Sequence, residues 1–301
     1  MHNILFTTDE KFAQHCGVCT VSLLKNNPRE RFSIVVVGMG LSESSQKNLK
    51  ACVNCFDNAV LEIVDFQKEK LIDFPQIGHY QKNIYLRLWV DEFFGDDVEK
   101  VLYLDVDTIV VDSISELFEI DLKDNVLASV NIPFATSHNR CHLPLEYEYF
   151  NSGVLIFNLK QWRLEDGRQK ILDFLLKNSD IALNPDQDAL NGVFYKKRLT
   201  LDYTYNAITP FFKKELFKKL GVRELSRIRE NVKIVHFNGN ARPWIYTCNH
   251  PYQRVYFKYL KYTPWSSYIP EDKSVFNYIK KQLRFMLGIE SFVKLATVKG
   301  K

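Results

Sequence analysis

Short apolar runs alternate with amphipathic stretches through the first hundred residues of the chain. Continuous runs rich in Ile, Leu, Val and Phe predict buried strands, whereas apolar residues spaced three or four apart predict helices. The predicted strands are 3–7, 32–37, 61–65 and 100–104. The predicted helices are 12–24, 42–54 and 85–94. This alternation is typical of an α/β protein, in which helices flank a Rossmann-like, mostly parallel central sheet.

The same alternation continues beyond residue 110. Strands are predicted at 126–130, 154–158 and 232–237, and helices at 171–176 and 187–194. Asn151, Ser152 and Gly153 are expected to form a polar turn before the strand that begins at residue 154. We expect one domain over residues 1–265.

The chain has 301 residues, of which 46% are hydrophobic and 25% charged, as in an ordinary globular protein. Its formal net charge of +4 is unevenly distributed. Residues 273–301 contain seven basic residues and one acidic residue, which leaves 33 basic and 35 acidic residues in 1–272. Because nucleic-acid binding needs a basic surface, the slightly acidic body excludes nucleic acid as the expected partner.

The segment 275–287 predicts an amphipathic helix. Its apolar residues share one face, and Lys280, Lys281 and Arg284 lie beside them. This pattern is typical of a helix that lies on anionic lipid. We therefore expect residues 266–301 to form a basic amphipathic tail that associates with an anionic membrane surface. The alternative is a C-terminal helix that packs on the body with its basic residues in solvent.

Neither a signal-peptide pattern, nor an apolar run approaching about 18 residues, nor an Asn-x-Ser/Thr sequon is found in the sequence. We expect a cytoplasmic protein with reduced cysteines, peripheral on the inner face of the cytoplasmic membrane. The pairs Cys16/Cys19 and Cys52/Cys55 leave a four-cysteine zinc site open. The separation of the pairs is longer than usual, which favours buried helix thiols.

Asp105 and Asp107 follow the apolar run 101–104 directly. Residues two apart in an extended chain point to the same side, and the carboxyl end of such a strand is where open α/β sheets bind ligands. Two carboxylates this close repel each other unless a proton or cation lies between them. Mg²⁺ or Mn²⁺ suits such oxygen ligands. The alternative to a metal site is that the two aspartates only end the strand and begin a turn.

Two further clusters add candidate ligands. His236 lies near the end of the predicted strand 232–237, and an imidazole beside two carboxylates favours Mn²⁺ over Ca²⁺. Asp186 and Gln187 lie where a loop enters a predicted helix. Taken singly, His236 also fits a packed core histidine, and Asp186 also fits a helix cap. The chain has no glycine-rich phosphate-binding motif, so bound phosphates would need another counter-charge.

Six segments, in order, resemble glycosyltransferase family 8, and most of all its bacterial lipopolysaccharide galactosyl- and glucosyltransferases. The segments are 6–9, 85–88, 101–107, 150–154, 186–191 and 236–244. The resemblance covers about residues 3–245 and implies a retaining enzyme of GT-A fold. It also implies a UDP-hexose donor and a divalent cation, usually Mn²⁺, with Mg²⁺ as the second choice.

The resemblance also implies roles for particular residues. The implied metal ligands are Asp105, Asp107 and His236. The implied donor-binding residues are Thr7, Thr8, Asp9, Phe12, Arg87, Asp105, Val106, Asn151, Gly153, Gly239 and Arg242. Gln187 is implied to face the anomeric carbon, and Asp186 is its rival as the catalytic residue. The family usually has Lys at the position of Arg242, so the contact of this residue with the diphosphate is a departure.

The implied activity moves galactose or glucose from a UDP-sugar to a saccharide or lipid-linked saccharide acceptor, with an α-glycosidic bond as product. The expected acceptor is lipopolysaccharide, lipooligosaccharide or another cell-surface glycan, bound by residues within 131–149 and 205–230. Two alternatives stay open. A haloacid-dehalogenase-like phosphatase also places Asp-x-Asp after an apolar strand, and a non-catalytic nucleotide-sugar or carbohydrate-binding protein would keep the same pocket.

Overall fold

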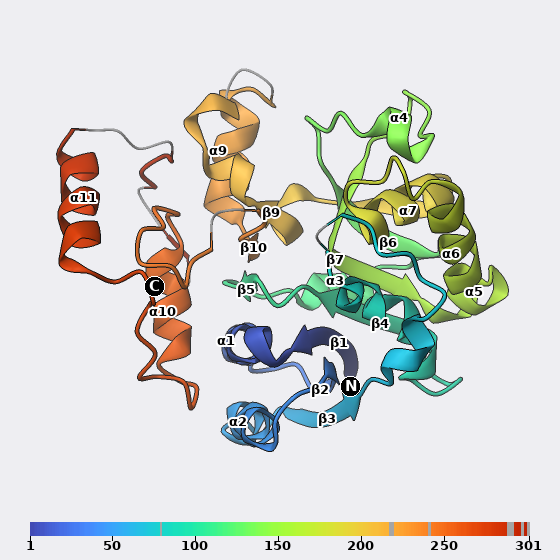
Figure 1. Ribbon diagram of the computed structural model, residues 1–301, viewed down its shortest axis with the longest axis horizontal. Coiled ribbons are helices and arrows are strands. Elements are labelled where there is room, and N and C mark those ends of the chain that lie inside the picture. The colour runs from blue at the N-terminus through green and yellow to red at the C-terminus, as the bar shows by residue number, and fades with distance from the viewer. Residues whose placement is uncertain (79, 217–219, 240–241, 288–291, 296–297, 300–301) are drawn as a thin grey trace.

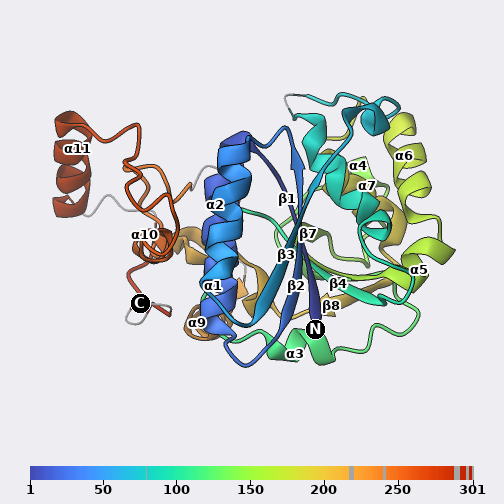
Figure 2. The same ribbon diagram turned by 90° about the horizontal axis from the view of Figure 1, so that it is seen from below.

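A seven-stranded sheet runs through the computed structural model, which describes the chain except for residues 79, 217–219, 240–241, 288–291, 296–297 and 300–301 (Figures 1 and 2). The strand order is β3-β2-β1-β4-β7-β6-β8. Only β7 runs antiparallel to its neighbours, so the predicted mostly parallel sheet is confirmed. The strands are β1 (His2–Asp9), β2 (Phe32–Met39), β3 (Ala59–Asp65), β4 (Lys100–Leu104), β6 (Leu127–Asn131), β7 (Phe150–Asn158) and β8 (Arg198–Leu201).

Alternate side chains of the strands form two separate core layers, because successive residues point to opposite faces of a sheet. Leu5 faces one layer, whereas Ile4 and Phe6 face the other. The Ile4 layer is covered by α1 (Ala13–Asn26), α2 (Glu43–Asn54) and α3 (Ser115–Glu119). The Leu5 layer is covered by η2 (Lys68–Leu71), η3 (Lys82–Glu92), α5 (Leu159–Leu164), α6 (Gly167–Lys177) and α7 (Pro185–Phe194).

A second sheet of three short strands has the order β5-β10-β9. Its strands are β5 (Thr108–Val110), β9 (Ala207–Ile208) and β10 (Ile234–His236). A third core cluster joins this sheet to the helical elements η5 (Thr209–Phe212), η6 (Lys214–Leu216), α9 (Val222–Asn231) and α10 (Gln253–Leu260). The remaining short elements are η1 (Glu10–Phe12), α4 (His138–Cys141) and η4 (Tyr203–Asn206).

Two local predictions need correction. The helix expected over 85–94 is the 3₁₀ helix η3, interrupted by a non-helical backbone at Trp89. Asn151, Ser152 and Gly153 lie inside β7 rather than in a turn before it. The pairing of β6 with β7 shifts register between Ser129 and Val130, and this irregularity lets the polar segment continue the strand.

The C-terminal region combines an outlying helix with a return to the body. The predicted helix is present as α11 (Val275–Met286), at the outer edge of the molecule in both views (Figures 1 and 2). Beyond it, the backbone N–H of Val293 donates to Phe212, and Lys299 forms an ion pair with Asp112. Within the described chain, no helix has both the length and the apolar character needed to cross a bilayer. The domain boundary at residue 265 stays a prediction.

Candidate active site

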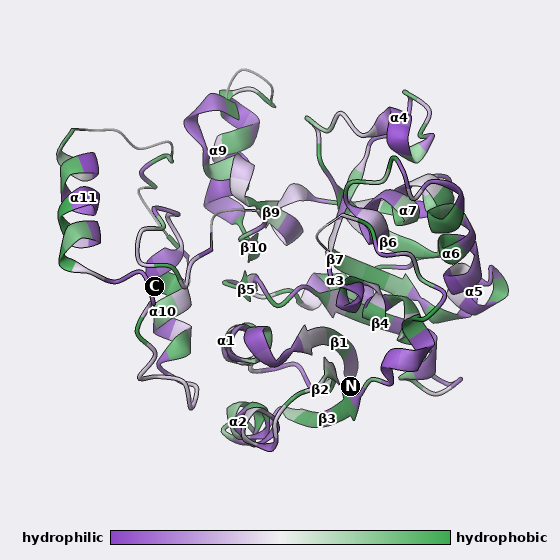
Figure 3. Cartoon of the chain, in the orientation of Figure 1, coloured by the Kyte–Doolittle hydropathy of each residue, from purple (hydrophilic) through white to green (hydrophobic). Residues whose placement is uncertain are grey.

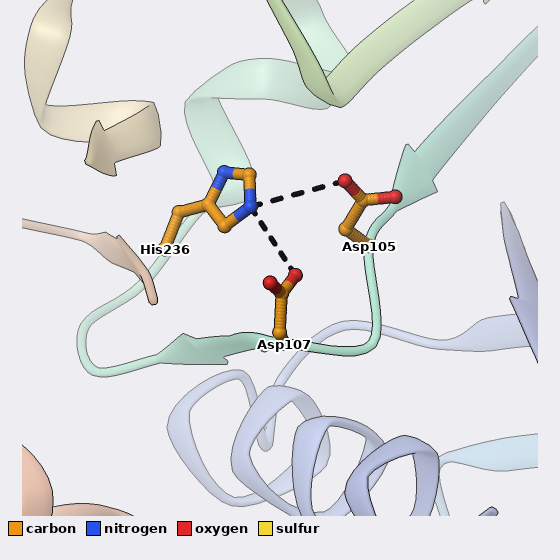
Figure 4. A group of neighbouring side chains, drawn as sticks. All are labelled: Asp105, Asp107 and His236. Carbon is orange, nitrogen blue, oxygen red and sulfur yellow. Dashed lines mark ion pairs between the residues drawn. The ribbon is translucent and has the colours of Figure 1, made fainter. Parts of the chain in front are cut away.

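Asp105, Asp107 and His236 meet where β4 leads into β5 and where β10 ends (Figure 4). Nε2 of His236 lies 3.2 Å from Oδ1 of Asp107 and 3.8 Å from Oδ2 of Asp105. Pairing of β5 with β10 places His236 opposite Thr108, so the small sheet itself brings these side chains together. In the part of the chain that the structure describes, no other group of three His, Cys, Asp or Glu side chains converges in this way.

Asp105 is held by one of its two carboxylate oxygens. Its Oδ1 accepts from the hydroxyl of Tyr103 at 2.6 Å and lies 3.0 Å from Nη2 of Arg87. Burial is the largest single effect on Arg87, which is only 6% exposed, and it opposes the charge. Asp105, Tyr103, Asp186 and Asp107 together outweigh burial and raise the pKa of the guanidinium. Oδ2 of Asp105 is left facing His236 and Asp107, which is the arrangement that a metal ligand requires.

His236 is oriented by a buried amide. Its Nδ1 lies 3.0 Å from Oδ1 of Asn206, and Nδ2 of Asn206 donates to Oδ1 of Asn151 at 2.8 Å. Because Oδ1 of Asn151 also accepts from the backbone N–H of Gly153, the direction of this chain of hydrogen bonds is fixed. Nδ1 of His236 therefore carries a proton, which leaves Nε2 as the nitrogen that would bind a metal between the two carboxylates, as in many metal-binding histidines.

The donor set fits a divalent cation. Burial favours the neutral imidazole, yet Asp107 and Asp105 outweigh it and raise the pKa of His236. Burial also opposes ionisation of Asp107, but His236 outweighs it and lowers the pKa of the carboxyl. The site thus has a negative potential that a cation neutralises. Two carboxylates with one imidazole suit Mn²⁺, and the oxygens also accept Mg²⁺.

Gly153 has no side chain, and the space that a side chain would fill there is occupied by this cluster. A Cβ atom at this position would lie 2.2 Å from Cε1 of His236 and 2.7 Å from Oδ2 of Asp105. Its backbone carbonyl also accepts from the N–H of Asp105 at 2.8 Å. The role of Gly153 in the structure is therefore to let β7 pass close to the side chains of His236 and Asp105.

We expect Asn206→Ala to weaken Mn²⁺ binding by about 10- to 100-fold, because loss of a ligand's orienting partner typically has this effect. The measurement is a Mn²⁺ titration followed by electron paramagnetic resonance, which counts free Mn²⁺ without any enzymatic assay. Asn54→Ala, at the exposed end of α2, is the control. Equal Mn²⁺ affinity of the two variants would show that Asn206 does not orient His236.

The opposite wall is formed by the start of α7. Nε of Arg87 lies 3.5 Å from Oδ2 of Asp186, which also accepts from the hydroxyl of Ser152. Burial raises the pKa of Asp186 more than Arg87 lowers it. Oε1 of Gln187 accepts from Nδ2 of Asn151 at 2.8 Å and from the backbone of Ser152 at 3.0 Å. Arg87 and Asn151 therefore connect the two walls.

Asp188, next to these residues, has a role that the sequence did not reveal. It is fully buried and accepts from Nε of Arg140 at 2.8 Å and from the hydroxyl of Tyr149 at 2.5 Å. Tyr149 in turn accepts from Nε2 of Gln187 at 2.8 Å. Asp188 thus holds Tyr149 in place, and Tyr149 orients the amide of Gln187. The only hint in the sequence was a cluster of acidic residues typical of a helix cap.

A cavity of about 520 Å³ lies between the two walls. Eight predicted site residues line it: Arg87, Asp105, Asp107, Asn151, Asp186, Gln187, His236 and Gly239. Ile132, residues 134–137, Arg140 and Tyr149 line it as well, which agrees with the expectation for the segment 131–149. No described residue of 205–230 is among the lining residues. Asn206 contacts His236, and much of the segment, such as Phe211 and Leu225, packs in the third core cluster.

The other predicted donor-binding residues lie outside the walls of this cavity. Thr7 and Thr8 are buried near the end of β1, and Asp9 accepts from the backbone of Phe12 and from Nδ2 of Asn83. Val106 lies between the two metal-binding aspartates. Arg242 is exposed and adjoins residues outside the described chain. Their contacts with a donor stay predictions.

The cysteines do not form the zinc site that the sequence left open. Cys16, Cys19 and Cys52 are buried, whereas Cys55 is exposed. Among the described residues, these thiols do not converge as a group of metal ligands. Burial raises the pKa of the thiols of Cys19 and Cys52 to about 12, as expected of packed thiols. Cys16, Cys19 and Cys52 act as apolar packing groups of α1 and α2.

Fold and site together define a class of protein: an α/β domain in which a polar cavity contains a group of side chains that could hold a divalent cation. The chain matches glycosyl transferase family 8 over residues 3–248. It therefore belongs to glycosyltransferase family 8.

Two similar proteins match most of the chain. General stress protein A of Bacillus subtilis is 30% identical over 276 residues, which cover 89% of this chain and 95% of the relative. A lipopolysaccharide 1,2-glucosyltransferase of Escherichia coli is 26% identical over 312 residues, which cover 99% of this chain and 91% of the relative. The match does not favour the phosphatase or the non-catalytic alternative.

A solved structure of the galactosyltransferase LgtC, in complex with donor and acceptor sugar analogues, is similar along its whole length. It is 26% identical, covers 93% of this chain and 99% of its own, and has a TM-score of 0.75. The predicted GT-A architecture is thereby confirmed, and the chain is a glycosyltransferase.

Proposed function

We propose that this protein transfers galactose or glucose from a UDP-sugar to a saccharide acceptor, with an α-glycosidic bond as product. One observation carries the proposal: the metal-binding group and the pair Asp186–Gln187 face the same cavity, joined by Arg87. The names of a lipopolysaccharide glucosyltransferase and a galactosyltransferase among its relatives support a hexose donor. Lipopolysaccharide, lipooligosaccharide or another cell-surface glycan is the proposed acceptor.

In this proposal, Asp105, Asp107 and His236 hold Mn²⁺, with Mg²⁺ as the second choice. When bound, the cation would neutralise the negative charge that develops on the departing diphosphate. Gly239, whose φ is +76°, allows the backbone to approach the diphosphate, and Arg242 adds a second positive charge. The hexose lies between Arg87, Asn151, Gly153 and Asp186.

The nucleoside end of the donor is proposed to lie beyond the cavity, near the end of β1. Asp9 reads the uracil edge, beside Thr7, Thr8 and Val106. Phe12 packs against the base. Support comes from the aromatic group already present there: the rings of Phe12 and Trp244 meet edge to face, with centroids 6.0 Å apart. Such a surface suits a planar base.

The structure of the Gln187 side chain favours positioning over nucleophilic attack. Its amide oxygen already accepts hydrogen bonds from Asn151 and from the backbone of Ser152, and its nitrogen donates to Tyr149. We therefore propose internal return. The acceptor oxygen bonds to the anomeric carbon on the side that the phosphate leaves, the C–O electron pair departs with UDP, and the phosphate oxygen takes the acceptor proton. Attack by Asp186 is the rival route.

Gln187→Ala is expected to lower the transfer rate by about 10²-fold, since a dipole that stabilises the developing positive charge is lost. The configuration of the product, measured by proton nuclear magnetic resonance, should stay α. Gln187→Glu is the isosteric companion variant. Full activity of Gln187→Ala would remove the amide from the mechanism, and a β product would contradict retention.

Hydrolysis of the donor in the absence of acceptor tests the proposed function itself. We expect slow release of UDP from UDP-galactose or UDP-glucose with Mn²⁺, and no turnover of p-nitrophenyl phosphate. Comparison of the two donors identifies the sugar. Turnover of p-nitrophenyl phosphate would support a phosphatase, and binding without hydrolysis would support a non-catalytic protein.

We also propose that the protein is cytoplasmic and acts on the inner face of the membrane, where a lipid-linked acceptor would be reached. Support comes from the apolar side chains of α11, several of which are about half or more exposed, such as Phe276 at 72% and Met286 at 71%. Such exposure is unfavourable in water and is relieved at a lipid interface.

A further inference from the structure

A second cavity, of about 290 Å³, lies between α11 and the loop that follows Trp244. The loop contributes Thr247 and Asn249, and the helix contributes Asn277, Lys280, Lys281 and Arg284. The catalytic side chains lie elsewhere, because no residue is shared between this cavity and the catalytic one. Three cations within one small space make it a candidate site for an anion.

Two of the charged groups in this cavity already have structural partners. Nζ of Lys281 donates to the carbonyls of Tyr246 and Cys248 and to Oε1 of Gln253, which ties α11 to the body. The carboxylate of Asp272 accepts from the backbone of Tyr246 and Thr247 and from the Thr247 hydroxyl. Asp272 is therefore occupied as a loop anchor.

Lys280 and Arg284 are the other two cations of this cavity. Within the described chain, neither side chain has an acidic partner within ion-pair distance. They are four residues apart, so they lie side by side on one face of the helix. With Lys281 and Asp272 included, the cavity has a net charge of about +2, which matches a phosphate group.

The arrangement of charged and apolar side chains around α11 indicates the source of that phosphate. At 100° per residue, Lys280 and Arg284 lie between the body-facing Lys281 and an apolar stripe. The stripe consists of Val275, Phe276, Ile279, Leu283 and Met286, which are 48–77% exposed. Figure 3 shows α11 with a hydrophobic and a hydrophilic side. A lipid has the same order of groups, with a phosphate next to acyl chains.

We propose that this cavity binds the phosphate group of an anionic phospholipid, with Arg284 as the bidentate ligand and Lys280 as a point charge, while the apolar stripe enters the acyl boundary. This inference rests on the membrane association proposed above. It assigns α11 a specific headgroup site in addition to general attraction between a basic surface and an anionic membrane.

Vesicle co-sedimentation of the full chain tests the site. One set of phosphatidylcholine vesicles contains phosphatidylglycerol, and the other contains a carboxylate lipid, cholesteryl hemisuccinate, at equal surface charge. We expect roughly fivefold tighter binding to the phosphoglycerol vesicles, because a guanidinium fork pairs with phosphate in a fixed geometry. Equal binding to both vesicles would overturn the proposal.

Arg284→Lys is the decisive variant, since it keeps the charge and removes the fork. We expect it to lose the preference for phosphatidylglycerol while it still binds both kinds of vesicle. Lys280→Ala with Arg284→Ala should bind phosphatidylglycerol vesicles about 30-fold more weakly than the native chain. Lys261→Ala with Lys273→Ala removes two charges outside the cavity and should keep the preference. Loss of the preference in this control would overturn the headgroup site.

Three further outcomes would contradict the proposal. Displacement from vesicles by 1 mM inorganic phosphate would assign the cavity to a soluble anion. A second outcome is that the native chain binds no vesicles and forms a dimer in analytical ultracentrifugation. Loss of this dimer in the variant Phe276→Ser with Leu283→Ser would assign the apolar stripe to a second copy. Absence of vesicle binding would refute membrane association, whereas hydrolysis of UDP-sugars in solution would leave the transferase assignment intact.

Discussion

Asp107→Asn is expected to lower the hydrolysis of the UDP-sugar donor by about 10³-fold, the largest effect of any single substitution considered for this protein. Asparagine keeps the shape of the side chain but removes the charge that faces Nε2 of His236 at 3.2 Å. The measurement is the rate of UDP release at saturating donor and increasing Mn²⁺. We expect much weaker Mn²⁺ dependence as well as a lower rate.

Asp57→Asn, on an exposed position before β3, is the matched control for this substitution. It removes the same charge from the protein and should retain the full rate. An Asp107→Asn protein that hydrolyses the donor at the native rate with unchanged Mn²⁺ dependence would show that Asp107 is not a metal ligand.

Gly153→Ala is expected to have the second largest effect, with loss of Mn²⁺ binding by at least about 10²-fold. The added methyl group would occupy space 2.2 Å from His236 Cε1 and 2.7 Å from Asp105 Oδ2, so at least one ligand must move. Overpacking of this kind also costs about 1–3 kcal/mol of the free energy of unfolding. Mn²⁺ titration and thermal unfolding measure the two effects separately.

Gly95→Ala is the control for Gly153→Ala. Its added Cβ would meet Asp97 Oδ1 at 2.7 Å, but Asp97 is an exposed side chain that can turn away. We expect native Mn²⁺ affinity and stability in this variant. A Gly153→Ala protein that binds Mn²⁺ as tightly as Gly95→Ala would contradict the packing described for the metal-binding group.

The metal-binding residues could be predicted because each has a local signal. Asp105 and Asp107 follow an apolar strand directly, and His236 ends another strand. Each position after an apolar strand is a typical ligand-binding position, but β10 belongs to the small sheet, and its pairing with β5 is what brings His236 to the two aspartates. The strands and helices of the large sheet were predictable for a similar reason, since burial imposes a period on their side chains.

The supporting residues had no such signal. Asn206 and Asp188 act through partners distant in sequence, such as His236 and Arg140, and only the folded chain shows these contacts. The strands β5 and β9 have three and two residues, too few to show a period. They form because β10 lies between them and pairs with both.

The two corrections, of η3 and of the segment 151–153, concern parts of the chain where the local sequence does not determine the backbone conformation. Side-chain spacing in η3 predicts a helix but does not distinguish a 3₁₀ from an α-helical hydrogen-bond pattern. Asn151, Ser152 and Gly153 have the composition of a turn, yet Asn151 pairs with Val130 of β6 and the carbonyl of Gly153 accepts from the N–H of Asp105, so the strand runs through them. Tertiary pairing outweighs local preference in this segment.

The central claim is that Asp105, Asp107 and His236 hold the cation that binds the donor diphosphate beside Asp186 and Gln187. Anomalous X-ray scattering from crystals grown with Mn²⁺ and a non-hydrolysable UDP-hexose tests it most directly. We predict one manganese peak within about 2.3 Å of all three ligands, with the hexose next to Gln187. A UDP-hexose bound with no manganese among these three side chains would contradict the account.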